Sequence, residues 1–261
     1  MPTFRAKGII IKNRKVREAD KIFTIITDNL GKIQAYGRST GKINSKLGGH
    51  LDLFTNSNLI LAKGKSMPTL VYAKAIDNFK NIKSNLEKTG IAFYASELLD
   101  NFLLEDYKDT RIYRLLYYFF IILDVPDIGD LVQIKILFWS FELKLLNLLG
   151  FLPELEKCVK CGKNITNNNN NFDFTSGGFI CSNCYNDSKS YFYQVDEEIV
   201  NLISKIFKGD AKILATLKIN NKQGFIIKET IDKYILYLIN KKIKSSEFLE
   251  KINSLERQFG I

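Results

Sequence analysis

The fold of the first third of the chain is decided by Phe4-Arg-Ala-Lys-Gly-Ile-Ile-Ile-Lys12, Lys21-Ile-Phe-Thr-Ile-Ile-Thr27 and Lys32-Ile-Gln-Ala-Tyr36. All three runs are rich in β-branched and aromatic residues, which favour extended backbone. Similar runs lie around Leu59–Leu61 and over Thr69–Ala75. Glycine, asparagine and proline cluster between the runs, as expected for turns. The first eighty residues therefore predict about five short strands.

Several short strands with no helical period between them indicate a small barrel or sandwich. A basic five-stranded barrel of this size is similar to an OB-fold, a common scaffold for binding single strands of nucleic acid. We therefore expect an OB-fold over residues 1–80.

After Lys80 the apolar period changes from two residues to about 3.6, which predicts helices. The expected helices are Ile91–Leu104, Thr110–Leu123 and Asp130–Leu149, followed by Asp196–Phe207 and Gly224–Phe259. Gly150 is placed to end the third helix, with Pro153 just beyond it. The chain is therefore expected to be an α+β protein of two domains, with a helical domain over residues 81–261.

The four cysteines all fall in one short region, as Cys158-Val-Lys-Cys161 and Cys181-Ser-Asn-Cys184. Two residues between thiols allow a tight turn that aims both sulfurs at one point, so two such pairs predict a tetrahedral Zn²⁺ site. Two disulfides are the alternative, but they are disfavoured because the chain shows no export signal. We expect one structural zinc in a module at about residues 153–193. The run Asn167–Asn171 inside it is interpreted as a loop tip.

The net charge of +10 is concentrated in the first third of the chain. Residues 1–80 contain 15 Lys and Arg against 5 Asp and Glu, whereas residues 81–261 contain 23 of each. A field of one sign on one small domain favours a polyanionic partner, most commonly nucleic acid. An anionic membrane surface, an acidic protein or a solvated surface without a partner remain alternatives.

Composition and motif spacing exclude several classes of protein. The chain of 261 residues has no uninterrupted apolar run long enough for a membrane span and no apolar leader after Met1, so a soluble, cytoplasmic protein is expected. Its single histidine, His50, is expected to be structural. Neither Gly64-Lys65-Ser66 nor Gly37–Lys42 has the spacing of a phosphate-binding loop. Glu18 and Asp20 form the only close acidic pair of the basic domain, so no enzyme is expected.

Several stretches together resemble the RecO family of bacterial recombination mediators. They are Lys7-Gly-Ile-Ile-Ile-Lys-Asn-Arg-Lys-Val-Arg-Glu-Ala-Asp-Lys-Ile22, Thr27-Asp-Asn-Leu-Gly-Lys32, Gly37-Arg38 through Ser45-Lys46 to Gly48-Gly49-His50-Leu51, and Glu142-Leu-Lys-Leu-Leu-Asn-Leu-Leu-Gly-Phe-Leu-Pro-Glu-Leu155 before Cys158-x-x-Cys161-Gly. They follow one another in the order of the family and cover nearly the whole chain.

The resemblance implies an N-terminal OB-fold and a helical domain with an embedded zinc module. It also implies a non-catalytic role in DNA repair and recombination: binding single- and double-stranded DNA, and annealing complementary strands. Together with RecR, such a protein helps to load RecA onto strands coated by single-strand-binding protein. A cytoplasmic, nucleoid-associated protein follows from that role.

The residues themselves suggest how DNA would be held. The candidate phosphate-binding cations lie on expected turns of the barrel: Arg14, Lys15, Arg17, Lys21, Arg38, Lys42 and Lys46. Tyr36 or Phe54 could stack on bases, although core packing is the other role open to both. Two rival functions stay open, an RNA-binding or ribosome-associated zinc-containing adaptor and an enzyme of strand cleavage.

Overall fold

A computed structural model describes residues 2–105, 107–165, 170–185 and 192–249. The chain divides into two compact units, one formed by Met1–Pro126 with the segment that begins at Ile243, and one formed by Asp127–Lys242. The α+β class expected from the sequence is confirmed. The expected domain boundary at Lys80 stays a prediction. The compact units are divided after Pro126 instead, so the first unit also includes the helices that follow the strands.

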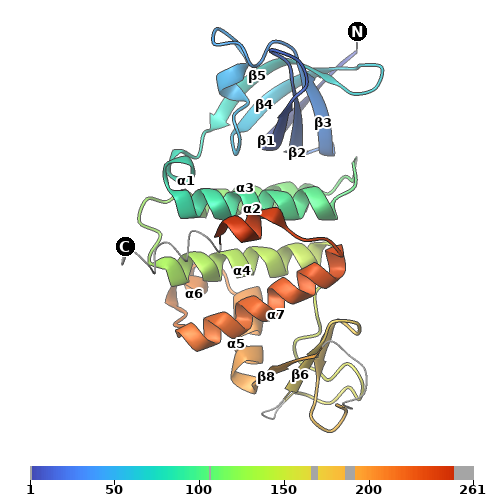
Figure 1. The fold of residues 1–261 in the computed structure, drawn as a ribbon, viewed down its shortest axis with the longest axis vertical. Coiled ribbons are helices and arrows are strands. Elements are labelled where there is room, and N and C mark those ends of the chain that lie inside the picture. Colours follow the sequence, from blue (N-terminus) through green and yellow to red (C-terminus); the bar gives the residue numbers. More distant parts are fainter. Residues whose placement is uncertain (1, 106, 166–169, 186–191, 250–261) are drawn as a thin grey trace. The chain divides into compact units, whose positions relative to one another are not determined.

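The first unit contains a closed barrel of five strands, in the order β1-β2-β3-β5-β4 (Figure 1). The strands are β1 (Thr3–Lys15), β2 (Lys21–Thr27), β3 (Gly31–Gly37), β4 (Asn56–Ala62) and β5 (Thr69–Asp77). Neighbouring strands are antiparallel except for β3 and β5, which pair in parallel. This closed five-stranded barrel is the OB-fold that the alternating runs predict.

Apolar side chains from every strand fill the barrel, among them Ile10, Phe23, Ile25, Leu59 and Leu61. In β2, alternate residues point into this core, yet the outward-facing residues Ile22, Thr24 and Ile26 are buried as well. Burial on both faces explains why β2 is a nearly continuous apolar run instead of alternating with polar residues.

Three helices follow the strands in the first unit, and the two longer ones lie against the barrel (Figure 1). They are α1 (Lys80–Ser84), α2 (Leu86–Phe102) and α3 (Thr110–Leu123). Phe54 packs edge-on against Phe93 of α2 and Phe120 of α3, with ring centroids 5.0 and 5.8 Å apart. These contacts join the helices to the barrel, and edge-to-face rings at this separation are favourable.

The second unit consists of helices α4 (Leu131–Leu148), α5 (Glu197–Lys208), α6 (Ala211–Thr216) and α7 (Asn221–Ile239) and a small sheet. The sheet has the order β7-β6-β8 and is formed by β6 (Asn170–Asp173), β7 (Gly178–Ile180) and β8 (Phe192–Val195). Gly150 follows α4 with a φ of 80°, and the Phe151 amide donates to the Leu146 carbonyl at 2.8 Å. The expected glycine stop is therefore confirmed.

Two expectations about this part of the chain are wrong. The single helix expected over Gly224–Phe259 stops at Ile239, because Asn240 adopts a left-handed conformation with φ of 50°, which asparagine tolerates better than most residues. Helical backbone resumes over residues 244–249, and residues 250–259 of the expected helix lie outside the described chain. The asparagine run is also not entirely a loop tip, since Asn170 and Asn171 are buried in β6; residues 167–169 lie outside the described chain.

Among the described residues, no helix combines the length and the apolar character that crossing a bilayer requires.

Glu142 of α4 is an unusual buried carboxyl group. Its side chain is 0 % exposed, and neither carboxyl oxygen has a hydrogen-bond partner among the described residues. Burial raises the pKa of Glu142 well above its usual range, and the negative charge of Asp232 on α7 raises it further. The positive charge of Lys228 lowers the pKa of Glu142, but Lys228 also forms an ion pair with Asp232 at 2.7 Å. Burial of Glu142 therefore favours its protonated form over the ionised one.

The substitution Glu142→Gln is expected to stabilise the protein at neutral and alkaline pH. Glutamate in an unfolded chain has a pKa of about 4.3, so folding above that pH requires Glu142 to take up a proton. The contribution of Glu142 to stability is complete below the unfolded pKa and is lost as the pH rises toward the folded pKa. Glutamine removes this dependence, and the stability difference should grow by up to about 1.4 kcal/mol per pH unit. Urea unfolding of both proteins between about pH 5 and 8 measures it; parallel pH profiles would contradict it.

Candidate nucleic-acid interface and metal centre

The candidate phosphate-binding residues lie at one end of the barrel. In the antiparallel register, Lys15 at the end of β1 faces Lys21 at the start of β2, and Lys21 faces Gly37 at the end of β3. Arg38 follows Gly37 directly, so three strand ends bring their cations together. We call the seven cations at this end the basic rim; they are Arg14, Lys15, Arg17, Lys21, Arg38, Lys42 and Lys46.

The loop after β3 folds back onto the turn between β1 and β2. The Gly41 amide donates to the Ala19 carbonyl at 2.8 Å, and the Ser39 amide donates to the Asp20 carboxylate at 2.7 Å. The Tyr36 hydroxyl also donates to Asp20. These bonds connect the two basic segments, and Asp20 is the residue that joins them.

Asp20 is held in its ionised form by this arrangement. The hydrogen bond from the Ser39 amide and then that from Tyr36 lower the pKa of Asp20, and the positive charges of Arg17 and Arg38 lower it further. A carboxylate at this position therefore offsets part of the repulsion between cations that the two segments bring close together. The sequence placed Asp20 in a close acidic pair with Glu18 and in a stretch that resembles a known family, but it did not reveal the bonds of Asp20 to Ser39 and Tyr36.

The cations of the basic rim are accessible to a partner. Lys21 is half-buried, and the other six are exposed. None of the seven forms an ion pair with any residue that the structure describes. Cations that lack a carboxylate partner are free to bind phosphate groups, so the geometry is that of a polyanion-binding surface.

Two other lysines of the basic domain have a structural role instead. Lys12 and Lys32 both bond to Asp100 of α2, with N–O distances of 2.7 and 3.3 Å. Lys32 is buried and also donates to the Asp100 backbone carbonyl at 2.8 Å. Some of the basic residues of the first eighty positions therefore attach a helix to the barrel instead of facing a partner. No local sequence signal shows which lysines have this structural role.

The aromatic residues considered for base stacking make contacts within the fold. Phe54 is 2 % exposed and packs against α2 and α3, which confirms the core alternative for this residue. Tyr36 is half-buried, and its hydroxyl is bound to Asp20. His50 also has structural partners: its Nδ1 accepts from the Ala75 amide at 3.4 Å, and its carbonyl accepts from the Ser57 hydroxyl at 2.6 Å.

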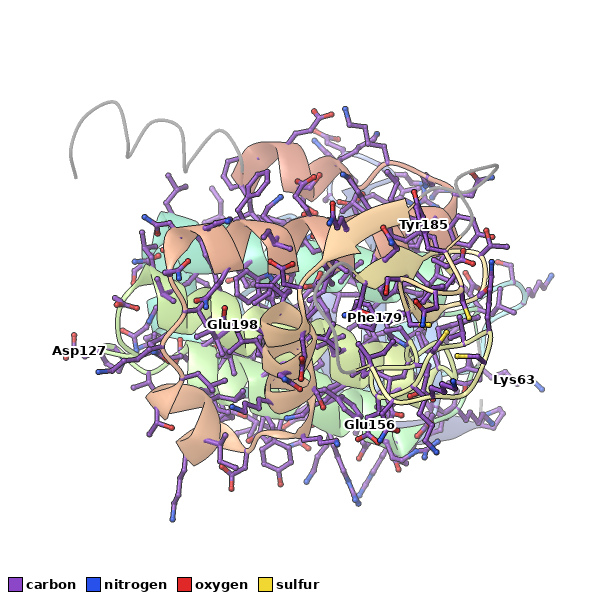
Figure 2. All side chains as sticks on the ribbon, turned by 90° about the horizontal axis from the view of Figure 1, so that it is seen from below. Lys63, Asp127, Glu156, Phe179, Tyr185 and Glu198 are labelled. Atoms are coloured by element: carbon purple, nitrogen blue, oxygen red, sulfur yellow. The ribbon has the colours of Figure 1, made fainter. Side chains whose placement is uncertain are left out.

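The four cysteines of the second unit converge on one point. The Sγ atoms of Cys158, Cys161, Cys181 and Cys184 all lie within 4.8 Å of one another, and those of Cys161 and Cys181 are 3.8 Å apart. All four are free thiols. A tetrahedron of sulfurs about 2.3 Å from a central zinc ion has edges of about 3.8 Å, so the donor set fits one metal ion. Figure 2 shows sulfur atoms close together near Phe179, whose carbonyl accepts from the Val159 amide at 3.0 Å.

The local backbone closes the first cysteine turn and favours the thiolate form of Cys158. Gly162 has a φ of 71°, and its amide donates to the Cys158 carbonyl at 2.8 Å, which closes the first turn as expected. Burial alone would raise the pKa of the Cys158 thiol, but hydrogen bonds from the Cys181, Cys161 and Lys160 backbones lower it to about 6. Amide donors to sulfur favour the thiolate, which is the form that binds metals.

The remaining thiols of the cluster stabilise that thiolate. Hydrogen bonds with Cys161 and Cys181 raise the pKa of Cys184 to about 12. A group of thiols that shares protons in this way releases them when a cation enters, so metal binding is expected to depend on pH.

Comparison with known proteins finds matches over nearly the whole chain. The family described as "Recombination protein O N terminal" matches residues 1–79, and "Recombination protein O C terminal" matches residues 83–247. The chain belongs to the RecO family. Three relatives named DNA repair protein RecO support this membership. That of Dehalococcoides mccartyi is 31% identical over 250 residues, covering 96% of each chain. That of Thermoanaerobacter sp. is 29% identical and covers 98% of this chain and 100% of the relative. That of Listeria innocua is 29% identical, covering 97% and 96%.

The RecO resemblance deduced from ordered sequence fragments is thus confirmed. Membership in the RecO family makes this chain a DNA repair protein, which implies an interaction with DNA. The exposed cations of the basic rim lie within the region matched to the RecO N-terminal model, and the four cysteines lie within the region matched to the C-terminal model.

Proposed function

We propose that this RecO-family chain is a non-catalytic DNA-binding recombination mediator of the RecF pathway. It would bind single- and double-stranded DNA, anneal complementary strands and, with RecR, help to load RecA onto strands coated by single-strand-binding protein. The main support for the proposal is the basic rim on the OB-fold barrel: six of its seven cations are exposed, and none has an ion-pair partner among the described residues.

The basic rim suggests a mechanism for annealing. Lysine and arginine side chains on turns neutralise phosphates without contacting base edges, so they bind many sequences equally well. Two complementary strands repel each other through their phosphates, and a surface that binds both lowers this repulsion. The bases remain free to pair, and the energy of pairing itself then drives the reaction.

The described residues also support a non-catalytic role. Of the close acidic pair in the barrel domain, Asp20 is engaged with Ser39 and Tyr36, which leaves only Glu18 as a candidate ligand for a catalytic cation. The Nδ1 atom of His50 accepts a hydrogen bond from the Ala75 amide, and the Ser57 hydroxyl donates to the His50 carbonyl. A strand-cleaving enzyme would require a cluster of acidic or nucleophilic groups, and the basic rim lacks one among its described residues.

We further propose that Cys158, Cys161, Cys181 and Cys184 hold one structural Zn²⁺. Four thiolates fill the tetrahedral shell of zinc, so no coordination position is left for substrate or water. The ion would join the two cysteine turns, in a part of the chain where a three-stranded sheet supplies little core. The chemistry supplied by the metal is therefore cross-linking, and the DNA-binding role depends on the barrel.

The proposed place of action is the bacterial cytoplasm, in association with the nucleoid, because the DNA partner is found there. RecR and single-strand-binding protein are the expected protein partners, and RecA is an indirect one. These partners follow from the family resemblance and not from a surface identified on this chain.

An annealing assay tests the proposal. Complementary oligonucleotides are coated with single-strand-binding protein, mixed with the purified chain, and followed by the fluorescence of a dye pair that reports duplex formation. We expect faster annealing with the chain than without it, and an acceleration that fades as salt is raised. Binding to structured RNA that is much tighter than binding to single-stranded DNA would instead favour the ribosome-associated adaptor. Cleavage of either strand in the presence of a divalent metal would contradict the non-catalytic role.

A further inference from the structure

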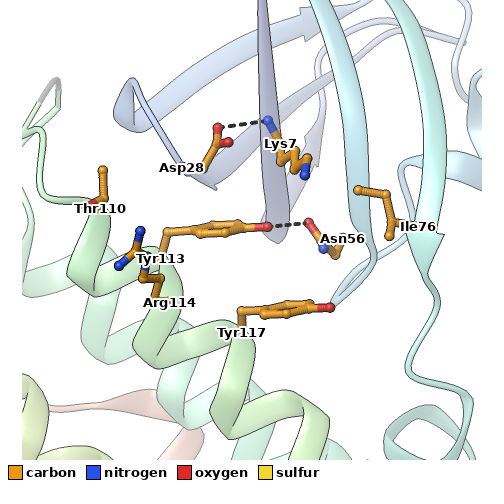
Figure 3. Close-up of a pocket in the computed structure, with 8 residues that line it drawn as sticks. All are labelled: Lys7, Asp28, Asn56, Ile76, Thr110, Tyr113, Arg114 and Tyr117. Atoms are coloured by element: carbon orange, nitrogen blue, oxygen red, sulfur yellow. Dashed lines mark hydrogen bonds between the residues drawn. The ribbon is translucent and has the colours of Figure 1, made fainter.

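A cavity of about 330 Å³ lies between helix α3 and the barrel, within the first compact unit. Its walls come from β1, β4, β5, the turn after β2 and one face of α3, as Figure 3 shows. The lining residues are Lys7, Asp28, Asn56, Ile76, Thr110, Tyr113, Arg114 and Tyr117. The volume is at the lower end of the range of about 300–1,000 Å³ that is usual for small-molecule sites.

Two tyrosines form the rigid wall of this cavity. The rings of Tyr113 and Tyr117 are parallel within 3°, with centroids 6.0 Å apart, and Figure 3 shows them extending side by side from α3 toward the strands. They lie on one face of the helix because they are four residues apart. Tyr113 is buried, whereas Tyr117 is half-buried and keeps part of its ring accessible.

Polar partners hold the Tyr113 ring in place. The Tyr113 hydroxyl donates to the Asn56 Oδ1 atom at 3.1 Å, and the Asn56 Nδ2 atom donates to Asp77 at 3.1 Å. Burial first, and then the negative charge of Asp77, raise the pKa of Tyr117. Tyr113 is therefore anchored at its polar end, and its ring lies parallel to that of Tyr117, so part of the aromatic wall is already ordered before a ligand binds.

Two cations beside the rings are free to bind an anion. Lys7 and Arg114 line the cavity and are exposed, and neither side chain forms an ion pair with any residue in the described part of the chain. The one carboxylate in the lining, Asp28, accepts a hydrogen bond from the Lys7 backbone amide at 2.9 Å but forms no ion pair with the Lys7 ammonium group. The site therefore combines an aromatic face, two cations and one hydrogen-bond acceptor.

We propose that this cavity binds a single unpaired nucleotide of a DNA strand, with its phosphate on Lys7 and Arg114 and its base against Tyr117. This inference rests on the proposed DNA-binding function and adds a second contact point to it. Aromatic rings bind bases of any sequence by stacking, and arginine and lysine bind phosphate. The Asp28 carboxylate can accept a hydrogen bond from a ring N–H of the base, such as N3–H of thymine, or from an exocyclic amino group.

The location of the cavity fits a strand that also contacts the basic rim. Lys7 precedes Lys15 by eight residues on β1, and Asp28 and Asn56 lie at the end of β2 and the start of β4. At about 3.3 Å per residue, the cavity lies at most about 26 Å from the basic rim along β1. OB-folds contact about 4–16 nucleotides of a single strand, so one strand can reach both places. A paired base cannot enter the cavity without leaving its stack, which makes the contact selective for single strands.

The test compares variants of the cavity in the full chain, using fluorescence polarisation of an oligo-deoxythymidine of about 20 nucleotides and of a duplex of equal length. We expect Arg114→Gln and Tyr117→Leu each to weaken single-strand binding about tenfold, because stacking on one aromatic side chain and one charge-assisted phosphate contact are each worth roughly that factor. Duplex binding should be unchanged. Tyr117→Phe keeps the ring and should bind like the parent protein. Arg111→Gln is the matched control, since it removes a charge from the same helix outside the cavity.

Each outcome separates this inference from the proposed function. Parent-like single-strand affinity of Arg114→Gln, with DNA binding otherwise intact, would overturn the cavity assignment and leave the basic rim in place. Loss in the Arg111→Gln control equal to that in Arg114→Gln would also overturn it. Titration with deoxythymidine monophosphate distinguishes a free nucleotide from a nucleotide of a strand. If Arg114→Gln abolishes saturable binding of the monophosphate but leaves binding of the oligonucleotide unchanged, the proposal that the cavity binds a DNA strand is wrong. Thermal unfolding of each variant shows whether Tyr117→Leu folds, and Arg114→Gln carries the test if it does not.

Discussion

The triple substitution Arg38→Glu, Lys42→Glu and Lys46→Glu is expected to weaken DNA binding by about a hundredfold near physiological salt. Each neutralised phosphate contributes about 0.9 to the slope of log K against log salt concentration, so loss of three contacts reduces the slope by about 2.7. These residues are exposed and lie in the loop after β3, whose fold depends on backbone bonds and Asp20 rather than on their side chains. The protein should therefore fold normally.

Polarisation titrations with single- and double-stranded DNA over a range of salt concentrations measure both the affinity and the slope. The matched control reverses three exposed lysines of the second compact unit, Lys212, Lys218 and Lys222, which gives the same change in net charge. If the basic rim is the DNA-binding surface, only the first triple substitution changes the slope. An equal loss of affinity in both proteins would show that net charge, and not this surface, determines binding.

Cys158→Ser is expected to reduce bound zinc from about one equivalent per chain to none. The Cys158 sulfur accepts a hydrogen bond from the Cys181 amide at 3.4 Å and so belongs to both turns of the cluster. Structural zinc contributes about 10–16 kcal/mol of apparent binding free energy in zinc-finger peptides near pH 7, so loss of one ligand should unfold the segment between the cysteine pairs. Metal analysis and limited proteolysis of residues 158–184 measure the two effects.

The neighbouring Ser182→Ala is the control, because Ser182 is exposed and lies between two of the cysteines without being a metal ligand. It should retain both the metal and the resistance to protease. Single-stranded DNA binding through the barrel should survive Cys158→Ser, since the basic rim belongs to the other compact unit. A metal-free protein with an intact protease-resistant segment would contradict the proposed role of zinc.

Much of the architecture follows from local patterns in the sequence. All five strands were expected at or near their observed positions, and helix α3 was expected with its observed bounds, Thr110–Leu123. Side-chain alternation, helical periodicity and glycine stops are properties of short segments, so a single chain reveals them. The sheet β7-β6-β8 was not expected, because its strands are three or four residues long, too short for a period to show.

The candidate sites differ in how far the sequence could predict them. The cysteine cluster was fully predicted, because its two turns are local and their spacing is typical of metal sites. The cations of the basic rim were expected on turns, but Lys15 and Lys21 lie at strand ends and Lys21 is half-buried. Their convergence depends on the pairing of Lys15 with Lys21 and of Lys21 with Gly37. Register of this kind is set by the whole barrel.

By itself, then, the sequence determined the five strands of the barrel, the main helices, the four cysteines suited to one metal ion and the concentration of positive charge in the first third. Only the tertiary structure decided which of those charges remain available. Lys12 and Lys32 are separated from Asp100 by 88 and 68 residues, yet this carboxylate binds both. The cavity lined by Lys7 and Arg114 likewise exists only where α3 meets the ends of the strands. Contacts between residues far apart in the chain depend on how complete elements pack together, and that packing leaves no local pattern in the sequence.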